Sequence, residues 1–125
     1  MYNIAVEQHF DAAHALRGYG GQCENLHGHR FKVIARIRAD KLNNIGLVYD
    51  FRAFKANLNH VLDRLDHTYL NEVAPFDCIN PSSENIASTI YHELKPMIEG
   101  ARLISVEVWE SPESMAEYCP WQNII

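Results

Sequence analysis

What the chain lacks excludes several classes of protein. Its 125 residues include only three cysteines, Cys23, Cys78 and Cys119, and no CxxC pair. An odd number of scattered cysteines is typical of free thiols in a reducing compartment rather than of a disulfide framework. No stretch approaches the ~20 apolar residues of a membrane span, and no basic region followed by an apolar run opens the chain. We therefore expect a cytoplasmic protein with no membrane partner.

Basic residues are also scarce. Lysine and arginine number 11 against 16 aspartates and glutamates, which gives a formal net charge of −5. This balance disfavours nucleic acid as the main partner, although a small anionic substrate is compatible with it if basic groups are clustered. The glycine-rich stretch 18–21 lacks both common phosphate-loop patterns. Length and a hydrophobic content of 47% predict one globular domain over residues 1–125.

The most informative stretch is Cys23-Glu24-Asn25-Leu26-His27-Gly28-His29, which follows His14. The two histidines of the stretch are two residues apart, so in an extended strand they point to the same face. With His14 they form a three-histidine set, which leaves one position of a tetrahedral zinc site free, as in catalytic centres. Cys23 is either a fourth ligand that closes this site or a nucleophile or base beside it.

Four strands are expected, over residues 2–10, 29–39, 102–110 and 115–119. Apolar residues alternate along the second strand in phase with the two histidines; they are Phe31, Val33, Ala35 and Ile37. Metal ligands are therefore predicted at the entrance of a strand, on its apolar face. Basic residues occupy the other face; they are Arg30, Lys32, Arg36 and Arg38. That face is either a solvated sheet surface or the lining of a polar lumen.

Two helices are expected between the second and third strands. Asp50 caps the first, whose apolar stripe is Phe51, Phe54, Leu58, Val61, Leu62 and Leu65. A serine of Pro81-Ser82-Ser83-Glu84 caps the second, whose stripe is Ile86, Ala87, Ile90, Tyr91 and Leu94. The order ββααββ predicts an α+β fold, a four-stranded antiparallel sheet with both helices on one face.

Two further groups are candidates for chemistry. Asp66-His67 at the end of the first helix is an acid–base pair or a solvated helix terminus, and a direct hydrogen bond between adjacent residues requires irregular backbone. Glu110 shares the strand face of Ile104, Val106 and Val108, so it is either partly buried and in need of donors, or exposed where the strand frays. A ligand with a guanidine-like edge would supply two parallel N–H donors to this carboxylate.

Taken together, these residues resemble the 6-pyruvoyltetrahydropterin synthase and 6-carboxytetrahydropterin synthase family over nearly the whole chain. Five motifs in order carry the resemblance: Phe10 to His14, Cys23-x-x-x-His27-Gly28-His29, Leu65-Asp66-His67, Asn80 to Asn85, and Trp109-Glu110-Ser111. Val48 to Phe51 is similar to the segment that opens the family's first helix. Two positions depart from the family pattern. Ser83 lies where the family commonly has a threonine, and Asp11 lies where it commonly has a small residue.

The resemblance implies specific roles. His14, His27 and His29 would bind Zn²⁺, and Cys23, Asp66 and His67 would be catalytic. Glu110, with Ser82 and Ser83, would hold the pterin. It further implies the tunnelling fold, in which three chains join their sheets into a barrel lined by the basic face, and two trimers stack as a hexamer. Cys23 would then meet the Asp66-His67 pair across a subunit boundary.

The implied reaction converts 7,8-dihydroneopterin triphosphate and water to 6-carboxy-5,6,7,8-tetrahydropterin, acetaldehyde and triphosphate, a step toward queuosine. The three-residue gap between Cys23 and His27 resembles the 6-carboxytetrahydropterin branch. Three alternatives stay open at this point: a 6-pyruvoyltetrahydropterin synthase acting on the same substrate, a zinc-dependent hydrolase, and a non-catalytic binding module whose zinc site is closed by Cys23.

Overall fold

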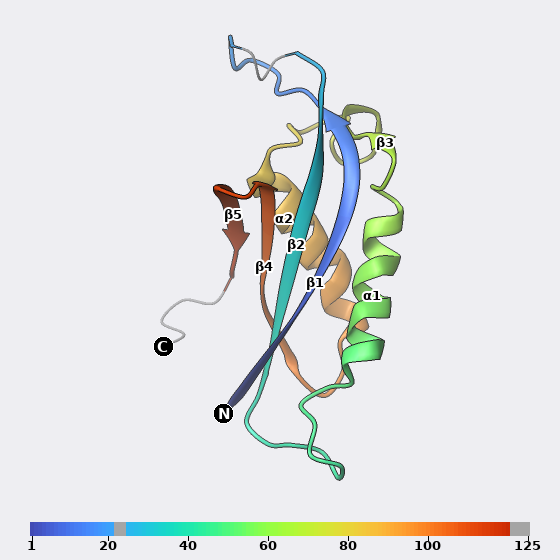
Figure 1. Ribbon diagram of the computed structural model, residues 1–125, viewed down its shortest axis with the longest axis vertical. Helices are drawn as coiled ribbons and strands as arrows, with labels where there is room; N and C mark the ends of the chain where they lie inside the picture. The colour runs from blue at the N-terminus through green and yellow to red at the C-terminus, as the bar shows by residue number, and fades with distance from the viewer. Residues whose placement is uncertain (22–24, 121–125) are drawn as a thin grey trace.

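The computed structural model describes residues 1–21 and 25–120 (Figure 1). The long strands β1 (Tyr2–His14) and β2 (His27–Ala39) come first, followed by helix α1 (Phe51–Asp63) and the short strand β3 (Thr68–Tyr69). Helix α2 (Ser83–Leu94) and strands β4 (Arg102–Ser111) and β5 (Ser114–Tyr118) complete the fold. Two 3₁₀ turns, η2 (Leu70–Glu72) and η3 (Lys95–Met97), lie in the connections.

The sheet has five strands in the order β3-β1-β2-β4-β5. The prediction of four antiparallel strands was wrong in this respect, because β3 pairs in parallel with β1 and makes the sheet mixed. Its two residues bond opposite Ala12 and Ala13. A two-residue strand is too short to show a periodicity of two, so the sequence pattern contained no sign of it.

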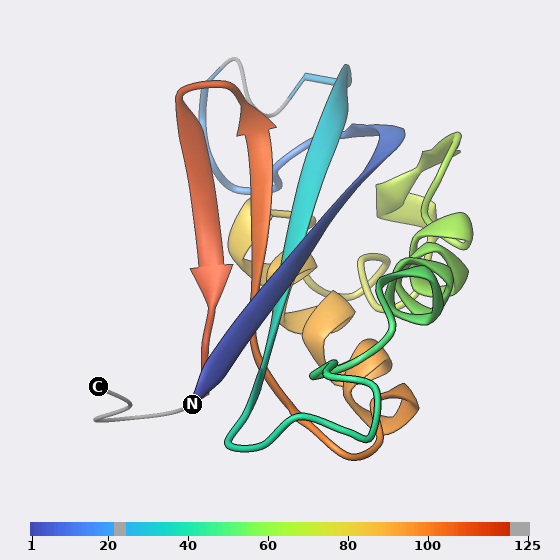
Figure 2. The ribbon, with the colours of Figure 1, turned by 60° about the horizontal axis from the view of Figure 1, so that its bottom comes forward.

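Both helices cover one face of the sheet, as expected for an α+β fold (Figure 2). Alternate residues of β1 and β2 face them, and Phe10 and Phe31 stack with ring centroids 4.8 Å apart. The predicted stripe of α2 is fully buried, and so is that of α1 from Phe54 to Leu65. Phe51 departs from the prediction: it is 50% exposed, because at the first position of α1 it borders an open groove with Tyr2 and Leu47.

Strand β4 contains two irregularities. Leu103 pairs with Ile37 and Ser105 with Arg36, so Ile104 is an extra residue, as in a β-bulge. Leu103 consequently joins the core cluster, whereas Ile104, although buried, lies outside it. A second irregularity lies between Trp109 and Ser111, where β4 has one residue more than β5 and Glu110 has no partner in the register.

The predicted helix caps are present. The Asp50 carboxylate accepts a hydrogen bond from the Arg52 N–H at 2.8 Å, and the Ser82 hydroxyl accepts one from the Asn85 N–H at 3.1 Å. Each cap satisfies a backbone donor that the helix leaves free at its first turn. In the described part of the chain, no helix combines the length and apolar character needed to cross a bilayer.

Candidate active site

Strand pairing brings three histidines together at one end of the sheet. His14, the last residue of β1, pairs with His27, the first residue of β2. His29 follows on the same face of β2. The ring centroids lie 4.5 Å apart for His14 and His27, 5.2 Å for His14 and His29, and 4.8 Å for His27 and His29. The predicted set therefore forms one cluster.

Backbone carbonyls fix the orientation of two of these rings. His14 Nδ1 lies 2.7 Å from the Pro81 carbonyl oxygen, and His27 Nδ1 lies 2.6 Å from that of Asn25. A carbonyl only accepts, so each Nδ1 donates and the neutral ring keeps a lone pair on Nε2. Such an outer hydrogen bond is what orients imidazoles that bind metals. The Nε2 atoms of His14 and His27 are thus available as ligands.

Glu110 directs its carboxylate into the same cluster. Its Oε1 atom lies 2.9 Å from His29 Nε2, 3.2 Å from His14 Nε2 and 3.8 Å from His27 Nε2. The side chain is 32% exposed, so the strand does not simply fray into solvent at this residue. Bulged strands of this kind are common beside active sites. The expectation of a partly buried Glu110 is confirmed.

The donor set fits a metal ion. One ligand atom from each of His14, His27, His29 and Glu110 lies within 4.8 Å of all the others. His29 Nε2 is buried and has no hydrogen bond in the described structure, even though it lies close to Glu110. Burial lowers the pKa of His29, which favours the neutral ring and its free lone pair. Three imidazole nitrogens and a carboxylate oxygen suit zinc and related cations.

The Asp66-His67 pair forms through an irregular backbone, as expected. His67 has a φ of +58°, in the left-handed region, directly after the turn that ends α1. This conformation allows its Nδ1 atom to lie 2.9 Å from Asp66 Oδ2. The Asp66 side chain is 34% exposed and that of His67 is 78% exposed. His67 is therefore far more open to solvent than the histidines of the cluster.

Asp11 holds this pair in place, a role that the sequence did not reveal. Its backbone N–H donates to Asp66 Oδ1 at 2.8 Å, and its carbonyl accepts from the His67 N–H at 2.6 Å. The first of these bonds lowers the pKa of Asp66. The Asp11 carboxylate itself accepts two bonds from Arg30, at 3.0 and 3.2 Å, which lower the pKa of Asp11. No sequence pattern could indicate these backbone contacts, because they depend on the pairing of β3 with β1.

The predicted residues thus fall into two separate groups. One comprises the three histidines and Glu110, and the other comprises Asp11, Asp66 and His67. Strand β3, which follows the pair, lies at the sheet edge beyond β1, whereas Glu110 lies on β4, two strands from β1 in the other direction. The two groups are therefore distinct clusters of ligand atoms within the described chain.

The remaining predicted site residues are Ser82, Ser83 and Cys23. Ser82 uses its hydroxyl as the cap of α2 and follows Pro81, whose carbonyl orients His14. Ser83 is the first residue of α2 and is half-buried. Cys23 lies outside the described residues. The binding roles of the serines and the catalytic role of Cys23 stay predictions.

The fold and site define an α+β domain with a candidate metal centre at one end of its sheet. Residues 3–120 match the family model described as 6-pyruvoyl tetrahydropterin synthase. The chain belongs to this family.

Individual members of the family differ in their similarity to the chain. The chain is 38% identical to the 6-carboxy-5,6,7,8-tetrahydropterin synthase of a Synechocystis strain, over 94% of this chain and 93% of the relative. It is 32% identical to the enzyme of the same name from Haemophilus influenzae, over 94% and 99%. The solved 6-pyruvoyl tetrahydropterin synthase of Caenorhabditis elegans superposes with a TM-score of 0.88 at 27% identity, covering 96% of both chains. Thus the chain shares its fold with a 6-pyruvoyl tetrahydropterin synthase, whereas these two relatives of higher sequence identity are named 6-carboxy-5,6,7,8-tetrahydropterin synthase.

Proposed function

We propose that the chain is a 6-carboxy-5,6,7,8-tetrahydropterin synthase. It would convert 7,8-dihydroneopterin triphosphate and water to 6-carboxytetrahydropterin, acetaldehyde and triphosphate in the route to queuosine. The observation that carries this proposal is the convergence of three imidazole Nε2 atoms on the Glu110 carboxylate. It is supported by relatives at 32–38% identity that bear this name. A cytoplasmic location stays a prediction.

We assign the metal as zinc, held by His14, His27 and His29. Neutral imidazoles and an adjacent carboxylate are its usual ligands, and three protein nitrogens leave a position for substrate oxygen. When bound, zinc supplies a Lewis acid that lowers the pKa of a coordinated hydroxyl.

Glu110 would accept two N–H bonds from the amino-pyrimidine edge of the pterin and fix the ring beside the histidines. A carboxylate is suited to such a paired donor edge. Ser82 and Ser83 would border the same ring, since Pro81 already contacts His14.

Cys23, as a thiolate, and His67 would move the protons. His67 Nδ1 is engaged by Asp66, at 2.9 Å, so its Nε2 atom is the one free to exchange a proton. The strong exposure of His67 suits a group that completes its site with a neighbouring chain.

We propose assembly into a trimeric barrel, with two trimers forming a hexamer. Most of β1 forms an edge of the sheet, because β3 pairs with only Ala12 and Ala13. The five-residue β5 forms the other edge. A long exposed edge strand is a template for pairing with another chain. Since β1 and β5 run antiparallel within the sheet, β5 of one copy can continue the antiparallel pattern on β1 of the next.

One experiment tests the reaction. The metal-loaded protein is incubated with 7,8-dihydroneopterin triphosphate, and both the pterin and any small aldehyde are identified. Acetaldehyde in a one-to-one ratio with 6-carboxytetrahydropterin supports the proposal. A 6-pyruvoyl product without acetaldehyde would assign the chain to the alternative synthase. Absence of any pterin conversion, with zinc bound, would favour the hydrolase or binding-module alternatives.

A second experiment tests the shared site. Cys23→Ala and His67→Ala chains, each nearly inactive alone, are refolded together into mixed oligomers. Some interfaces then combine two wild-type partners, so a fraction of turnover should return. Mixing without refolding is the control. If verified mixed oligomers show no gain, both catalytic groups belong to one chain.

A further inference from the structure

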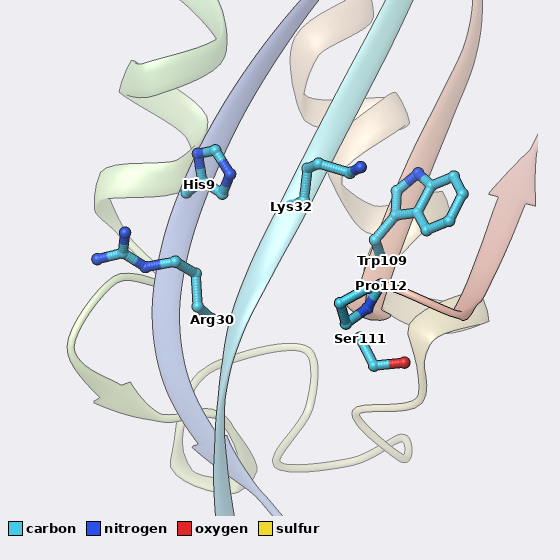
Figure 3. A pocket seen from close by; sticks show the side chains of 6 residues that line it. All are labelled: His9, Arg30, Lys32, Trp109, Ser111 and Pro112. Atoms are coloured by element: carbon cyan, nitrogen blue, oxygen red, sulfur yellow. The ribbon is translucent and has the colours of Figure 1, made fainter.

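The helix-free face of the sheet carries a hollow that lies away from the cluster of His14, His27 and His29. It has a volume of about 340 Å³ and is lined by His9, Arg30, Lys32, Trp109, Ser111 and Pro112 (Figure 3). A volume of this size is at the lower end of the range for small-molecule sites. The face is the one opposite to Phe10, His29 and Phe31, because the lining residues of β1 and β2 alternate with these.

A row across three strands forms the centre of the hollow. His9 pairs with Lys32, and Lys32 pairs with Trp109. The Lys32 ammonium lies over the Trp109 ring, 4.3 Å from its centroid. The indole N–H donates to Glu107 Oε1 at 2.9 Å, which fixes the ring. The hollow therefore has a rigid aromatic wall with a cation held against it.

The charge of the hollow is opposite to that of the whole chain. Its titratable lining residues are all basic, whereas the chain has a formal net charge of −5. Within residues 1–21 and 25–120, no carboxylate forms an ion pair with Lys32. Arg30 is paired with Asp11, so its charge is partly offset. The Lys32 ammonium is thus available to bind an anionic ligand. The Ser111 hydroxyl, which also lines the hollow, can donate a hydrogen bond to the same ligand.

We propose that this hollow binds a phosphate-bearing small molecule. Phosphate oxygens would accept bonds from Lys32, and a planar part of the ligand would contact Trp109 and Pro112. Two kinds of compound could supply the phosphate group: the triphosphate released by the proposed reaction, and a phosphorylated ring compound such as a nucleotide. In the proposed barrel the hollow faces the lumen, but the binding chemistry does not depend on that assembly or on the reaction.

The test is calorimetric titration of the full-length protein with orthophosphate, inorganic triphosphate and GMP, without pterin. Lys32→Met keeps most of the apolar stem and removes the charge. Lys55→Met, on the exposed face of α1, is the matched control. Loss of a charge-assisted bond should weaken binding roughly tenfold or more in Lys32→Met, and should leave Lys55→Met like the parent. Tighter binding of triphosphate than of GMP identifies the reaction product as the source, and the reverse identifies a ring compound.

Two additional measurements locate the ligand. Titration after removal of metal by a chelator, repeated in His29→Ala, should leave the Lys32-dependent binding intact. In a Trp121→Phe background the emission reports Trp109 alone, and it should change on binding as the ammonium leaves the ring. Equal binding by the two lysine variants, unchanged Trp109 emission, or no binding of any probe at millimolar concentration would overturn the proposal. Because binding is measured without pterin, its failure is distinct from failure of the proposed reaction.

Discussion

The two groups of candidate catalytic residues are built in different ways. His14, His27 and His29 lie on regular strands, in phase with the core, and two of them are oriented by backbone carbonyls. Asp66 and His67 lie on a turn after α1, where His67 adopts a left-handed backbone and its side chain is 78% exposed. Regular strands hold the candidate metal ligands, and a strained turn holds the exposed acid–base pair.

This difference has a physical basis. A metal site needs several atoms fixed within a few tenths of an ångström, which rigid elements provide. A proton-transfer pair needs contact with substrate and with solvent, and a turn at the edge of the sheet provides both. The left-handed residue has a conformational cost, which the bonds of Asp66 and His67 to the Asp11 backbone help to offset.

Removal of a histidine from the cluster should have the largest effect. His14→Ala, His27→Ala and His29→Ala should each lose most bound zinc and reduce turnover by roughly 100-fold or more, since even outer partners of metal ligands are worth 10–100-fold. His60→Ala, on the exposed side of α1, is the control and should keep both. Metal content and turnover are measured together. Full zinc content in any of the three variants would remove that histidine from the ligand set.

Cys23→Ala separates the two possible roles of the cysteine. Because we assign this residue to proton transfer, the variant should lose turnover and keep zinc. Metal analysis checks this directly, and zinc loss comparable with that of the histidine variants would make Cys23 a ligand instead.

Glu110→Gln should separate pterin binding from metal binding. Zinc should remain, because three imidazoles hold it, whereas affinity for a non-reactive pterin should fall by about 1.5–3 kcal/mol, as for other bonds to charged groups. Calorimetry with zinc content measured on the same samples checks both. If affinity is unchanged, Glu110 is not the pterin anchor; if zinc is lost as well, the carboxylate is a metal ligand.

At His67 the backbone conformation predicts an unusual order of stability. His67→Gly should be more stable than His67→Ala by roughly 1–2 kcal/mol, because only glycine adopts the left-handed region without cost. Both variants should lack activity. At His60, inside α1, the order should reverse by about 1 kcal/mol. Urea unfolding of the four variants gives the comparison, and the same order at both positions would contradict the conformation of His67.

The smallest effect concerns acid stability. The Asp11 N–H bond lowers the pKa of Asp66 from its ordinary value of 3.8, so Asp66 stabilises the folded chain above that pH. This contribution is lost as the pH falls from 3.8 through the lowered value, where the folded state must take up the proton. In the Asp66→Asn variant, the urea concentration at the unfolding midpoint should therefore decrease less between neutral and acid pH than it does in the parent. An unchanged acid profile would show that Asp66 does not contribute.

Much of the strand-built site was predictable from sequence. Alternation along β2 placed His27 and His29 on the face of Phe31, and His14 completed the predicted three-histidine set. The helices followed from their stripes and caps. The family motifs led to Asp66, His67 and Glu110 and to their proposed roles.

The rest depends on pairing and local backbone, which a periodic pattern does not encode. Strand β3 is two residues long, and its position beside Ala12 determines how Asp11 holds Asp66 and His67. The extra residue Ile104 reverses the phase of β4, so Leu103 faces the core cluster as Val106 and Val108 do. Phe51 fits the stripe of α1, yet it lies at the first position of the helix, where the core ends.

The contact between His14 and Glu110 joins residues 96 positions apart. These two residues of the site come together only after β1, β2 and β4 have paired, so the unfolded chain has little of the geometry that a cation requires. The core of aromatic and aliphatic side chains is complete without the cation. Metal loading therefore follows folding, and it should raise the melting temperature in proportion to the logarithm of free metal concentration, without being needed for the chain to fold.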